Sequence, residues 1–430
     1  MQKVLIITYY WPPAGGPGVQ RWLKFVKYLR DFEVEPIVYV PKNPHYPIID
    51  KSFEAEIPSG ITIIKQPINE PYQLAGIFSK KESKTISSGI IKDEKQQGFL
   101  QKMMLWVRGN LFIPDARMLW VKPSVKFLST YLKENNIETI ITTGPPHSLH
   151  LIGKQLKENL KLNWIADFRD PWTKIGYHQK LKLTKASQEK HLRLEREVLQ
   201  TADHILTTSF TTKKDFSKIT KKPITVITNG FDDDEVEEVM LAEKFRLSHI
   251  GSLLSERNPQ ELWKALQELV AEKEDFANDL ELVLAGKVSE TVVSSIKEHH
   301  LGKYLIEKGY LSHEESLIQQ RKAQVLLLIE IDKEETQGII PGKFFEYVKA
   351  NRPILAMGPK NWDVIRLLEE TQAGKYFNYT SKEEIKQQVY AWYQEYKSGK
   401  LRVNSSAEKI EQFHRKKLTE KLANVIQQFN

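Results

Sequence analysis

Short apolar runs alternate along the chain with longer segments in which apolar residues recur at helical spacing. The runs of the first half are VLII, PIVYV, ITII, ETIITT, WIADF, HILTTS and PITVIT, and those of the second half are RLSHIG, LELVLAG, VLLLIEI and PILAM. Apolar strands that alternate with helices are typical of parallel sheets covered by helices on both faces. The pattern therefore predicts an α/β fold with doubly wound parallel sheets.

The alternation is interrupted once, at the acidic run DDDEVEE, which precedes a new strand at Phe245. We interpret residues 232–244 as a linker between an N-terminal domain over residues 1–231 and a C-terminal domain over residues 245–405. A chain of 430 residues is long enough for two domains of about 200 residues each. Each domain is then an open α/β unit, in which ligands bind beyond the carboxyl ends of the strands.

Residues 406–430 depart from this pattern. Their apolar residues have an amphipathic spacing and include Ile410, Phe413, Leu418, Leu422 and Ile426. This spacing predicts a terminal helix that packs its apolar face on another surface.

Region 80–122 also differs from its neighbours. Residues 80–98 are polar and lysine-rich, which predicts a mobile insertion. Residues 99–120, FLQKMMLWVRGNLFIPDARMLW, are apolar and aromatic, with basic residues interspersed. Two interpretations stay open: a buried helix, or an interfacial helix that contacts an anionic membrane beside the lysines.

Composition narrows the functional classes. The chain has no cysteine, so disulfides, thiolate metal sites and cysteine nucleophiles are excluded. It has no apolar stretch near the ~18 residues that span a bilayer and no secretion signal, so we expect a cytoplasmic protein, with peripheral contact at the inner face of the membrane as an alternative. The net charge of +8 favours anionic partners. Nucleic acid is not expected, because the basic residues do not form a recognisable binding module.

Glycines and prolines separate the first strand from the first helix, in YYWPPAGGPGVQR. Gly16 and Gly18 allow the backbone to approach a ligand, and the following helix N-terminus favours an anion. The dinucleotide fingerprint is not met, because Arg21 stands where its third glycine is required, and the chain has no G-x-x-x-x-G-K-[ST] phosphate loop. A tight turn without a ligand is the alternative.

The second half contains TQGIIPGKFFEYVKANRPILAMG, in which a Gly-rich turn precedes a helix. We expect this helix to open at Lys343 and to carry Glu346 in its first turn. Its N-terminus can bind phosphate, Lys343 supplies a positive charge, and Glu346 can accept hydrogen bonds from sugar hydroxyls. An ordinary helix start, with Glu favoured by the helix dipole, is the alternative.

A second turn in this half, HIGSLLSERNPQEL, follows a strand and contains Gly251, Ser252 and Arg257. If Arg257, Lys343 and the helix N-terminus converge, they form a clamp for a departing diphosphate, whose charge grows in the transition state.

In the first half, TTGPPHSLHLIG and WIADFRDPW both follow strands. We interpret His147 as a polar contact in a cleft, with a structural histidine as the alternative. Asp167, Arg169 and Asp170 are either a structural ion network or a group that binds the acceptor and handles protons.

Two patterns imitate metal sites. His147 and His150 have i, i+3 spacing, but the sequence offers no third ligand and no H-E-x-x-H motif. Asp232, Asp233 and Asp234 imitate a D-x-D motif, but a solvated charge run suits their place in the linker better. No metal site is therefore expected.

Taken in order, the motifs YYWPPAGGPGVQR, TTGPPHS, ADFRDPW, ITNGFD, GSLLSERNP and GIIPGKFFEY with NRPILA resemble those of bacterial glycosyltransferase family 4-like proteins of surface-polysaccharide pathways. The resemblance covers nearly the whole chain. Each motif alone is weakly specific, whereas six in the same order are fairly specific. The resemblance implies a GT-B fold, with two Rossmann-like domains that face a cleft and a C-terminal helix that returns to the first domain.

The resemblance also implies a retaining, metal-independent transfer of a sugar from a nucleotide-diphosphate donor, with UDP as the expected nucleotide, to a saccharide or lipid-linked acceptor. It places Arg257 and Lys343 at the donor diphosphate, Glu346 at the ribose and His147 at the transferred sugar. The full assignment is His147, Arg257 and Lys343 for catalysis; Gly16, Gly18, Gly251, Ser252, Gly338, Ile340, Gly342 and Glu346 for donor binding; and Arg21, Asp167, Arg169 and Asp170 for the acceptor side.

The chain departs from the family pattern at one position. Many members carry two glutamates eight positions apart, but Gly338 stands eight residues before Glu346. Glu334 or Glu335 is a substitute from the same loop, and the donor sugar stays unassigned. Two alternative functions remain: a GT-B-fold sugar-nucleotide epimerase, and a non-catalytic partner that binds the donor without turnover.

Overall fold

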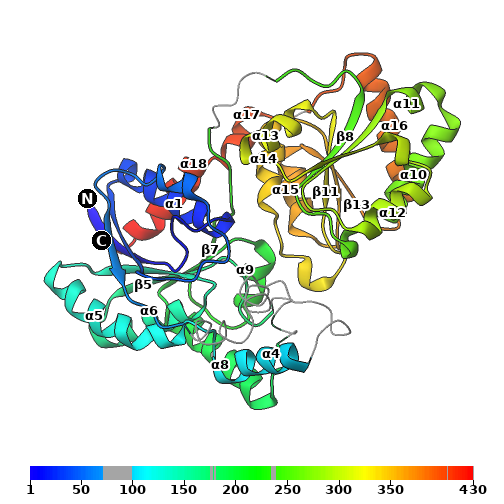
Figure 1. Ribbon diagram of the computed structural model, residues 1–430. Coiled ribbons are helices and arrows are strands. Elements are labelled where there is room, and N and C mark those ends of the chain that lie inside the picture. Colours follow the sequence, from blue (N-terminus) through cyan, green and yellow to red (C-terminus); the bar gives the residue numbers. More distant parts are fainter. Residues whose placement is uncertain (71–98, 175–177, 179–180, 234–238, 404, 430) are drawn as a thin grey trace. The chain divides into compact units, whose positions relative to one another are not determined.

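The apolar runs form two parallel sheets, each in its own part of the chain (Figure 1). The computed structural model describes residues 1–70, 99–174, 178, 181–233, 239–403 and 405–429. It divides into two compact units, the first comprising Met1–Thr228 with Arg415–Asn430 and the second Asn229–His414. The predicted insertion over residues 80–98 and residues 234–238 of the acidic run lie outside the described residues.

The first unit contains a seven-stranded sheet in the order β3-β2-β1-β4-β5-β6-β7. Its strands are β1 (Gln2–Ile7), β2 (Val34–Pro41), β3 (Thr62–Gln66), β4 (Thr139–Gly144), β5 (Asn163–Phe168), β6 (His204–Thr207) and β7 (Ile224–Val226). Neighbouring strands pair in parallel. The strand order reverses between β1 and β4, which is where open α/β sheets bind ligands.

Helices cover both faces of this sheet (Figure 1). The helices of the first unit are α1 (Pro17–Leu29), α4 (Phe99–Leu111), α5 (Val121–Glu134), α6 (Ser148–Leu160), α8 (Lys185–Thr201), α9 (Phe210–Phe216) and α18 (Arg415–Gln427), with short 3₁₀ turns at η1 (Arg30–Phe32), η2 (Lys51–Glu54) and η4 (Met118–Trp120). Apolar residues of α5, α6 and α8 share one core with the sheet, and those of α1 and α18 share the other. The alternating side chains of the strands supply both cores.

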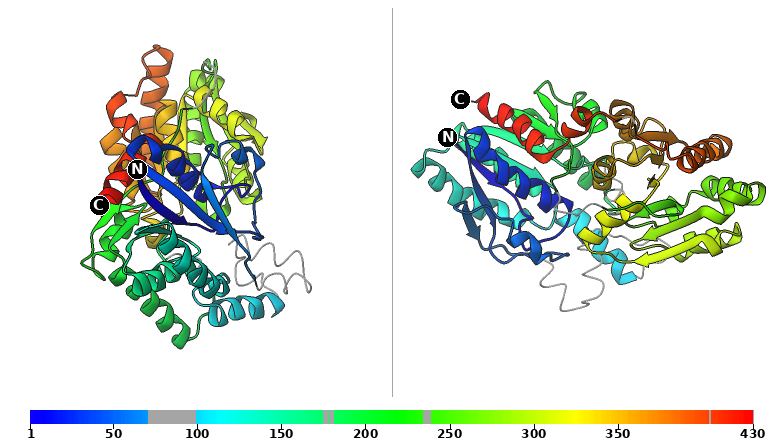
Figure 2. Two further views of the ribbon diagram at one scale, coloured as in Figure 1. Left: turned by 90° about the vertical axis from the view of Figure 1, so that its left-hand side faces the viewer. Right: turned by 90° about the horizontal axis from the view of Figure 1, so that it is seen from above.

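The terminal segment forms two helices where the sequence predicted one over residues 406–430. Helix α17 (Ala407–Glu411) belongs to the second unit, and α18 belongs to the first. Leu418, Leu422 and Ile426 of α18 are buried in the core that contains α1, and the Gln2 side-chain amide donates to the carbonyl of Ile426 over 3.4 Å. Figure 2 shows β1 and α18 close together. The predicted return of a C-terminal helix to the first unit is confirmed for α18.

The second unit contains a six-stranded parallel sheet in the order β10-β9-β8-β11-β12-β13. Its strands are β8 (Phe245–Ile250), β9 (Leu280–Ala285), β10 (Leu305–Gly309), β11 (Val325–Ile329), β12 (Ile354–Met357) and β13 (Gly374–Phe377). The order reverses between β8 and β11. The apolar runs did not predict β10 and β13, because both are edge strands whose residues are mostly half-buried or exposed.

The helices of the second unit also lie on both faces of their sheet (Figure 1). They are α10 (Gln260–Glu272), α11 (Glu274–Asp279), α12 (Glu290–Glu298), α13 (His313–Lys322), α14 (Gly342–Ala350), α15 (Asp363–Thr371), α16 (Lys382–Lys397) and α17, with 3₁₀ turns at η5 (Ser255–Arg257), η6 (Gly302–Tyr304) and η7 (Glu334–Thr336). Apolar side chains of α10, α12 and α16 pack against the sheet in one core. Two parallel-sheet α/β units confirm the predicted fold class.

The apolar segment over residues 99–120 forms α4 and then η4, and of these two elements α4 is only partly buried. Leu105 is buried with Leu181, but Met103 is 48%, Trp106 44% and Leu111 61% exposed. None of the helices in the described part of the chain is long and apolar enough to cross a membrane.

Candidate active site

Two groups of polar residues lie at the carboxyl ends of the strands, one in each unit, beside the points where the strand order reverses. In the second unit the group follows β8 and β11. In the first unit it follows β1, β4 and β5.

Arg257 of the second unit is held by a buried carboxylate. Its guanidinium donates through Nε and Nη2 to both oxygens of Glu330, over 2.9 and 3.1 Å. Glu330 directly follows β11 and is 1% exposed, and it also accepts a hydrogen bond from the backbone N–H of Ile331. Such a bidentate pair fixes the plane of the guanidinium. The Nη1 group takes no part in this pair.

Lys343 lies at the second residue of α14, and its ammonium group reaches the turn after β8. Its Nζ atom is 3.3 Å from Nε2 of the buried His249. A Cβ atom on Gly251 would come within 2.7 Å of Nζ, and Gly251 has a φ of 116°, so both space and backbone favour glycine there. Burial, followed by the charge of Arg257, lowers the pKa of Lys343 to about 8, against the influence of Glu330 and Glu346. At neutral pH the amine is therefore mostly charged.

Helix α14 begins at Gly342 and has no side-chain cap. A Cβ on Gly342 would meet no atom within 4 Å, so this helix N-terminus has open space beside it. Uncapped N–H groups with the positive end of the helix dipole attract anions. Lys343 belongs to the first turn of this helix and the charge of Arg257 acts on it, an arrangement compatible with the diphosphate clamp, which stays a prediction.

The sequence predicted Glu346 in the first turn of α14, but the helix begins at Gly342 and not at Lys343, so Glu346 lies beyond that turn. The Gln320 side chain of α13 donates to Glu346 Oε2 over 2.9 Å. Gln320 is buried and orients the carboxylate.

The remaining predicted donor residues lie in the loops around this point. Ser252 is exposed and directly follows Gly251. Gly338 and Ile340 are half-buried in the loop that leads to α14. That loop is held by the Trp362 indole, which donates to the carbonyl of Ile339 over 2.6 Å.

In the first unit, Gly16 and Gly18 have different surroundings. Gly16 precedes α1 with a φ of 103°, and a Cβ there would meet nothing within 4 Å. A Cβ on Gly18 would lie 1.8 Å from Nη1 of Arg169. Gly18 therefore makes room for the Arg169 guanidinium, whereas Gly16 leaves open space.

His147 follows β4 and is 5% exposed. Its ring stacks on Trp172, with the ring centroids 5.0 Å apart and an angle of 3° between the ring planes. Neither ring nitrogen has a hydrogen-bond partner among the described residues. Burial, with His150 and Arg169 nearby, lowers its pKa well below the usual value, so the ring is neutral. A satisfied structural histidine would have a partner for at least one nitrogen.

Arg21 and Asp167 form a buried network within the protein. Asp167 is fully buried and accepts hydrogen bonds from Arg21 (3.0 Å), the Trp22 indole (2.9 Å) and the Thr143 hydroxyl (2.8 Å). Arg21 also donates to the carbonyls of Ile227 and Thr228, the last two residues before the chain passes into the second unit. This arrangement supports the structural interpretation of these two residues rather than the acceptor-side one.

Arg169 and Asp170 lie at the end of β5 and are half-buried. The Arg169 guanidinium donates to the carbonyl of Pro145, one of the residues before His147. Burial raises the pKa of Asp170, and the charge of Arg169 partly offsets this. These two residues, unlike Arg21 and Asp167, remain candidates for ligand contact.

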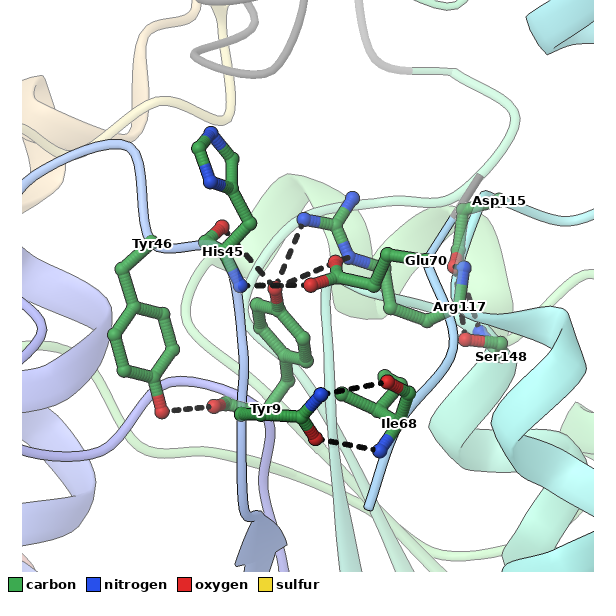
Figure 3. A network of polar contacts seen from close by, with 9 residues as sticks. Tyr9, His45, Tyr46, Ile68, Glu70, Asp115, Arg117 and Ser148 are labelled. Carbon is green, nitrogen blue, oxygen red and sulfur yellow. Dashed lines mark hydrogen bonds and ion pairs between the residues drawn. The ribbon is translucent and has the colours of Figure 1, made fainter. Parts of the chain in front are cut away.

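A third network in the first unit was not predicted from the sequence (Figure 3). The Tyr9 hydroxyl donates to Glu70 over 2.7 Å, and Arg117 Nε pairs with the same carboxylate over 3.2 Å. Glu70 also accepts a hydrogen bond from the backbone N–H of His45 over 2.7 Å. Asp115 accepts from the backbone N–H and hydroxyl of Ser148 and so caps α6 next to His147. Sequence offered no signal for this network, because Glu70 lies outside any motif and Arg117 stands out only as one of the basic residues in the apolar segment 99–120.

In the described parts of the two units, no three or more His, Asp or Glu side chains come together in a set that could hold a metal ion.

Comparison with known proteins identifies the architecture. No protein-family model and no curated protein matches the sequence. Among solved structures, sucrose-phosphate synthase of Thermosynechococcus elongatus is 12% identical with a TM-score of 0.58, covering 100% of this chain and 99% of that one. HepE of Anabaena in complex with UDP is 12% identical with a TM-score of 0.58, covering 100% of both chains.

A putative UDP-N-acetylglucosamine 2-epimerase of Listeria monocytogenes is similar too, at 13% identity and a TM-score of 0.53, covering 99% of this chain and 95% of that one. At these identities the likeness concerns the fold alone. The two sheets and the structural neighbours together show that the chain has the GT-B fold.

Proposed function

We propose that this chain is a glycosyltransferase that moves a sugar from a nucleotide-diphosphate donor to a saccharide or lipid-linked acceptor, in the synthesis of a bacterial surface polysaccharide. One observation carries the proposal: Lys343, Arg257 and the uncapped N-terminus of α14 come together where the strand order of the second unit reverses. Two cations and a helix N-terminus suit a diphosphate.

The donor has further partners in the second unit. Glu346, oriented by Gln320, can accept hydrogen bonds from the two ribose hydroxyls. UDP is the proposed nucleotide, because the structural neighbour HepE is in complex with UDP. Gly338, in place of the family's first glutamate, leaves the donor sugar open.

The proposed mechanism retains the configuration of the sugar and uses no metal ion. The bond from the anomeric carbon to the leaving phosphate oxygen breaks, the acceptor oxygen attacks from the same face, and the leaving oxygen takes the acceptor's proton. Lys343 and Arg257 stabilise the negative charge that grows on the diphosphate. In transferases that use a metal ion, the metal ion stabilises this charge instead. In the first unit, His147, whose ring nitrogens have no hydrogen-bond partner among the described residues, is proposed to contact the transferred sugar.

Thermal unfolding with UDP, GDP, ADP and dTDP, each with and without EDTA, tests donor binding. A nucleotide at ~100 times its Kd adds about 2.7 kcal/mol to the free energy of unfolding, which raises Tm by several degrees. We expect UDP to do so in the presence of EDTA, and Glu346→Ala to lose most of the shift. Glu298→Ala, an exposed change on α12, is the matched control and keeps it. If none of the four nucleotides raises Tm, the proposal is wrong.

The epimerase alternative has a specific observation in its favour, the likeness to the epimerase of Listeria monocytogenes. Incubation of the UDP-sugar without an acceptor separates the two functions. A transferase leaves the configuration of the donor sugar unchanged, whereas an epimerase produces a second UDP-sugar. Donor binding with neither reaction, over a panel of acceptors, favours the non-catalytic partner.

A lipid-linked acceptor brings the protein to the inner face of the membrane, and α4 is the proposed contact because it exposes Met103, Trp106 and Leu111. Trp106→Ser removes an apolar contribution of about 1–2 kcal/mol, so binding to anionic vesicles falls roughly tenfold in a sedimentation assay. Tyr310→Ser, at a residue 94% exposed in the second unit, is the control and leaves binding unchanged. Equal binding by both variants would exclude α4 as the membrane contact.

A further inference from the structure

His249 stands out in the second unit as a polar side chain near the end of a buried strand. It is the fifth residue of β8, whose last four residues are all buried. Its accessible surface is 0%, and its ring lies between the backbone of β11 and the ammonium group of Lys343. A fully buried imidazole of this kind needs a partner for each nitrogen.

The two contacts of the ring define its tautomer. Nδ1 is 2.9 Å from the carbonyl oxygen of Leu327, which can only accept, so Nδ1 carries the hydrogen. Burial, followed by the charge of Lys343, lowers the pKa of His249 well below the usual value, so the ring is neutral and Nε2 has a lone pair. The ammonium of Lys343, 3.3 Å away, can donate to it. The Ser252 carbonyl, 3.4 Å from Nε2, offers no hydrogen and does not compete.

We propose that His249 is a positioning residue for Lys343: anchored to Leu327 through Nδ1, it accepts a hydrogen bond from the Lys343 ammonium at Nε2 and holds that charge over the Gly251 turn. The proposal rests on the function proposed above, because the group it holds is the cation assigned to the donor diphosphate.

Other charges also act on this pair. The charge of Arg257 lowers the pKa of Lys343 and so disfavours its charged form, while Glu330 and Glu346 raise this pKa and favour the charged form. Arg257 itself is paired with Glu330, and Glu346 with Gln320. His249 is the neutral acceptor in this group, so it can orient the ammonium without cancelling its charge. A carboxylate in the same place would orient Lys343 but neutralise it toward a diphosphate.

Two substitutions separate the two contacts. In His249→Asn, the amide nitrogen can replace Nδ1 and keep the bond to Leu327, but nothing reaches Lys343. In His249→Gln, the amide oxygen can replace Nε2 and keep an acceptor for Lys343. The pair therefore distinguishes loss of the lysine's acceptor from loss of the strand contact.

The test measures the charge of Lys343 without any nucleotide. The rate at which the Lys343 amine reacts with acetic anhydride, followed by mass spectrometry, rises with pH as the amine loses its proton. In the wild type we expect the midpoint near the pKa of about 8. Loss of a hydrogen bond to the charged form moves the midpoint in His249→Asn to lower pH by about one unit, whereas His249→Gln stays near the wild type. Equal midpoints in His249→Asn and the wild type, or equal shifts in both variants, overturn the proposal.

UDP binding at pH 7.5 supplies the functional readout. His249→Asn is expected to raise the Kd about tenfold, and His249→Gln less than threefold. An unchanged Kd in His249→Asn overturns the positioning role toward the donor. If the wild type binds no UDP, the proposed function fails, and the labelling experiment still decides whether His249 holds Lys343.

Discussion

Replacing Lys343 by methionine is expected to lower kcat for sugar transfer by about 10²–10³, while the KM for the donor rises less than tenfold. Methionine keeps the length of the side chain and removes its charge. The physical reason is that the diphosphate gains charge as the bond from the anomeric carbon to the phosphate oxygen breaks, so the half-buried ammonium of Lys343 stabilises the transition state more than the bound donor. Initial rates over a range of donor concentrations separate the two constants.

The matched control is Lys297→Met, which removes an exposed lysine from α12 of the same unit and should leave both constants unchanged. An unaltered kcat in Lys343→Met would contradict the assignment of this residue to the leaving diphosphate. A large rise in KM with kcat unchanged would assign Lys343 to donor binding alone.

The second large effect is expected on stability, at Asp167. Asp167→Ala leaves the buried Arg21 guanidinium without its carboxylate and removes the acceptor of the Trp22 and Thr143 hydrogen bonds. Removal of one partner from a buried ion pair costs about 3–5 kcal/mol. For a domain of this size, Tm of the first unit falls by roughly 6–20 °C, measured by differential scanning calorimetry.

Glu35→Ala is the control, because Glu35 pairs with Arg30 at a partly exposed site in the same unit, with an oxygen–nitrogen distance of 2.6 Å. Partly exposed pairs contribute at most about 1 kcal/mol, so Tm should change by a few degrees or less. If Asp167→Ala and Glu35→Ala lower Tm by similar amounts, the buried ion pair contributes no more to the free energy of unfolding than the partly exposed pair does.

The fold was predictable because the strands of both sheets are apolar runs with turn residues at their ends. The exceptions, β10 and β13, are edge strands, and their partial exposure removes the apolar signal. The break between α17 and α18 was missed as well, since the amphipathic spacing continues through residues 412–414 although α18 packs in the other unit.

The candidate site was only partly predictable. Arg257 and Lys343 were found because each follows a glycine-containing turn, at Gly251 and at Gly338 to Gly342 respectively. Their partners Glu330 and His249 are 73 and 94 residues away in sequence, so only the fold brings them together. A charged or polar residue at the end of an otherwise apolar strand, as in VLLLIEI and RLSHIG, is the signal that could have identified both.

Arg21 and Arg169 show that similar sequence surroundings do not predict whether a side chain is buried. Both are arginines beside conspicuous motifs, and sequence assigned both to the acceptor. The structure separates them, because Arg21 of α1 is buried with Asp167 of β5, whereas Arg169 is half-buried and occupies the space that Gly18 leaves. Burial depends on packing across the whole unit, which no local motif encodes.

The position of α18 has a consequence for synthesis. The first unit contains the opening 228 residues, yet one layer of its core comes from a helix that begins at Arg415, after the whole of the second unit. During translation, residues 229–414 have therefore all been made before the ribosome adds the helix that covers α1. The unit encoded first is completed last, and until then the apolar face of α1 is a surface that a chaperone would recognise.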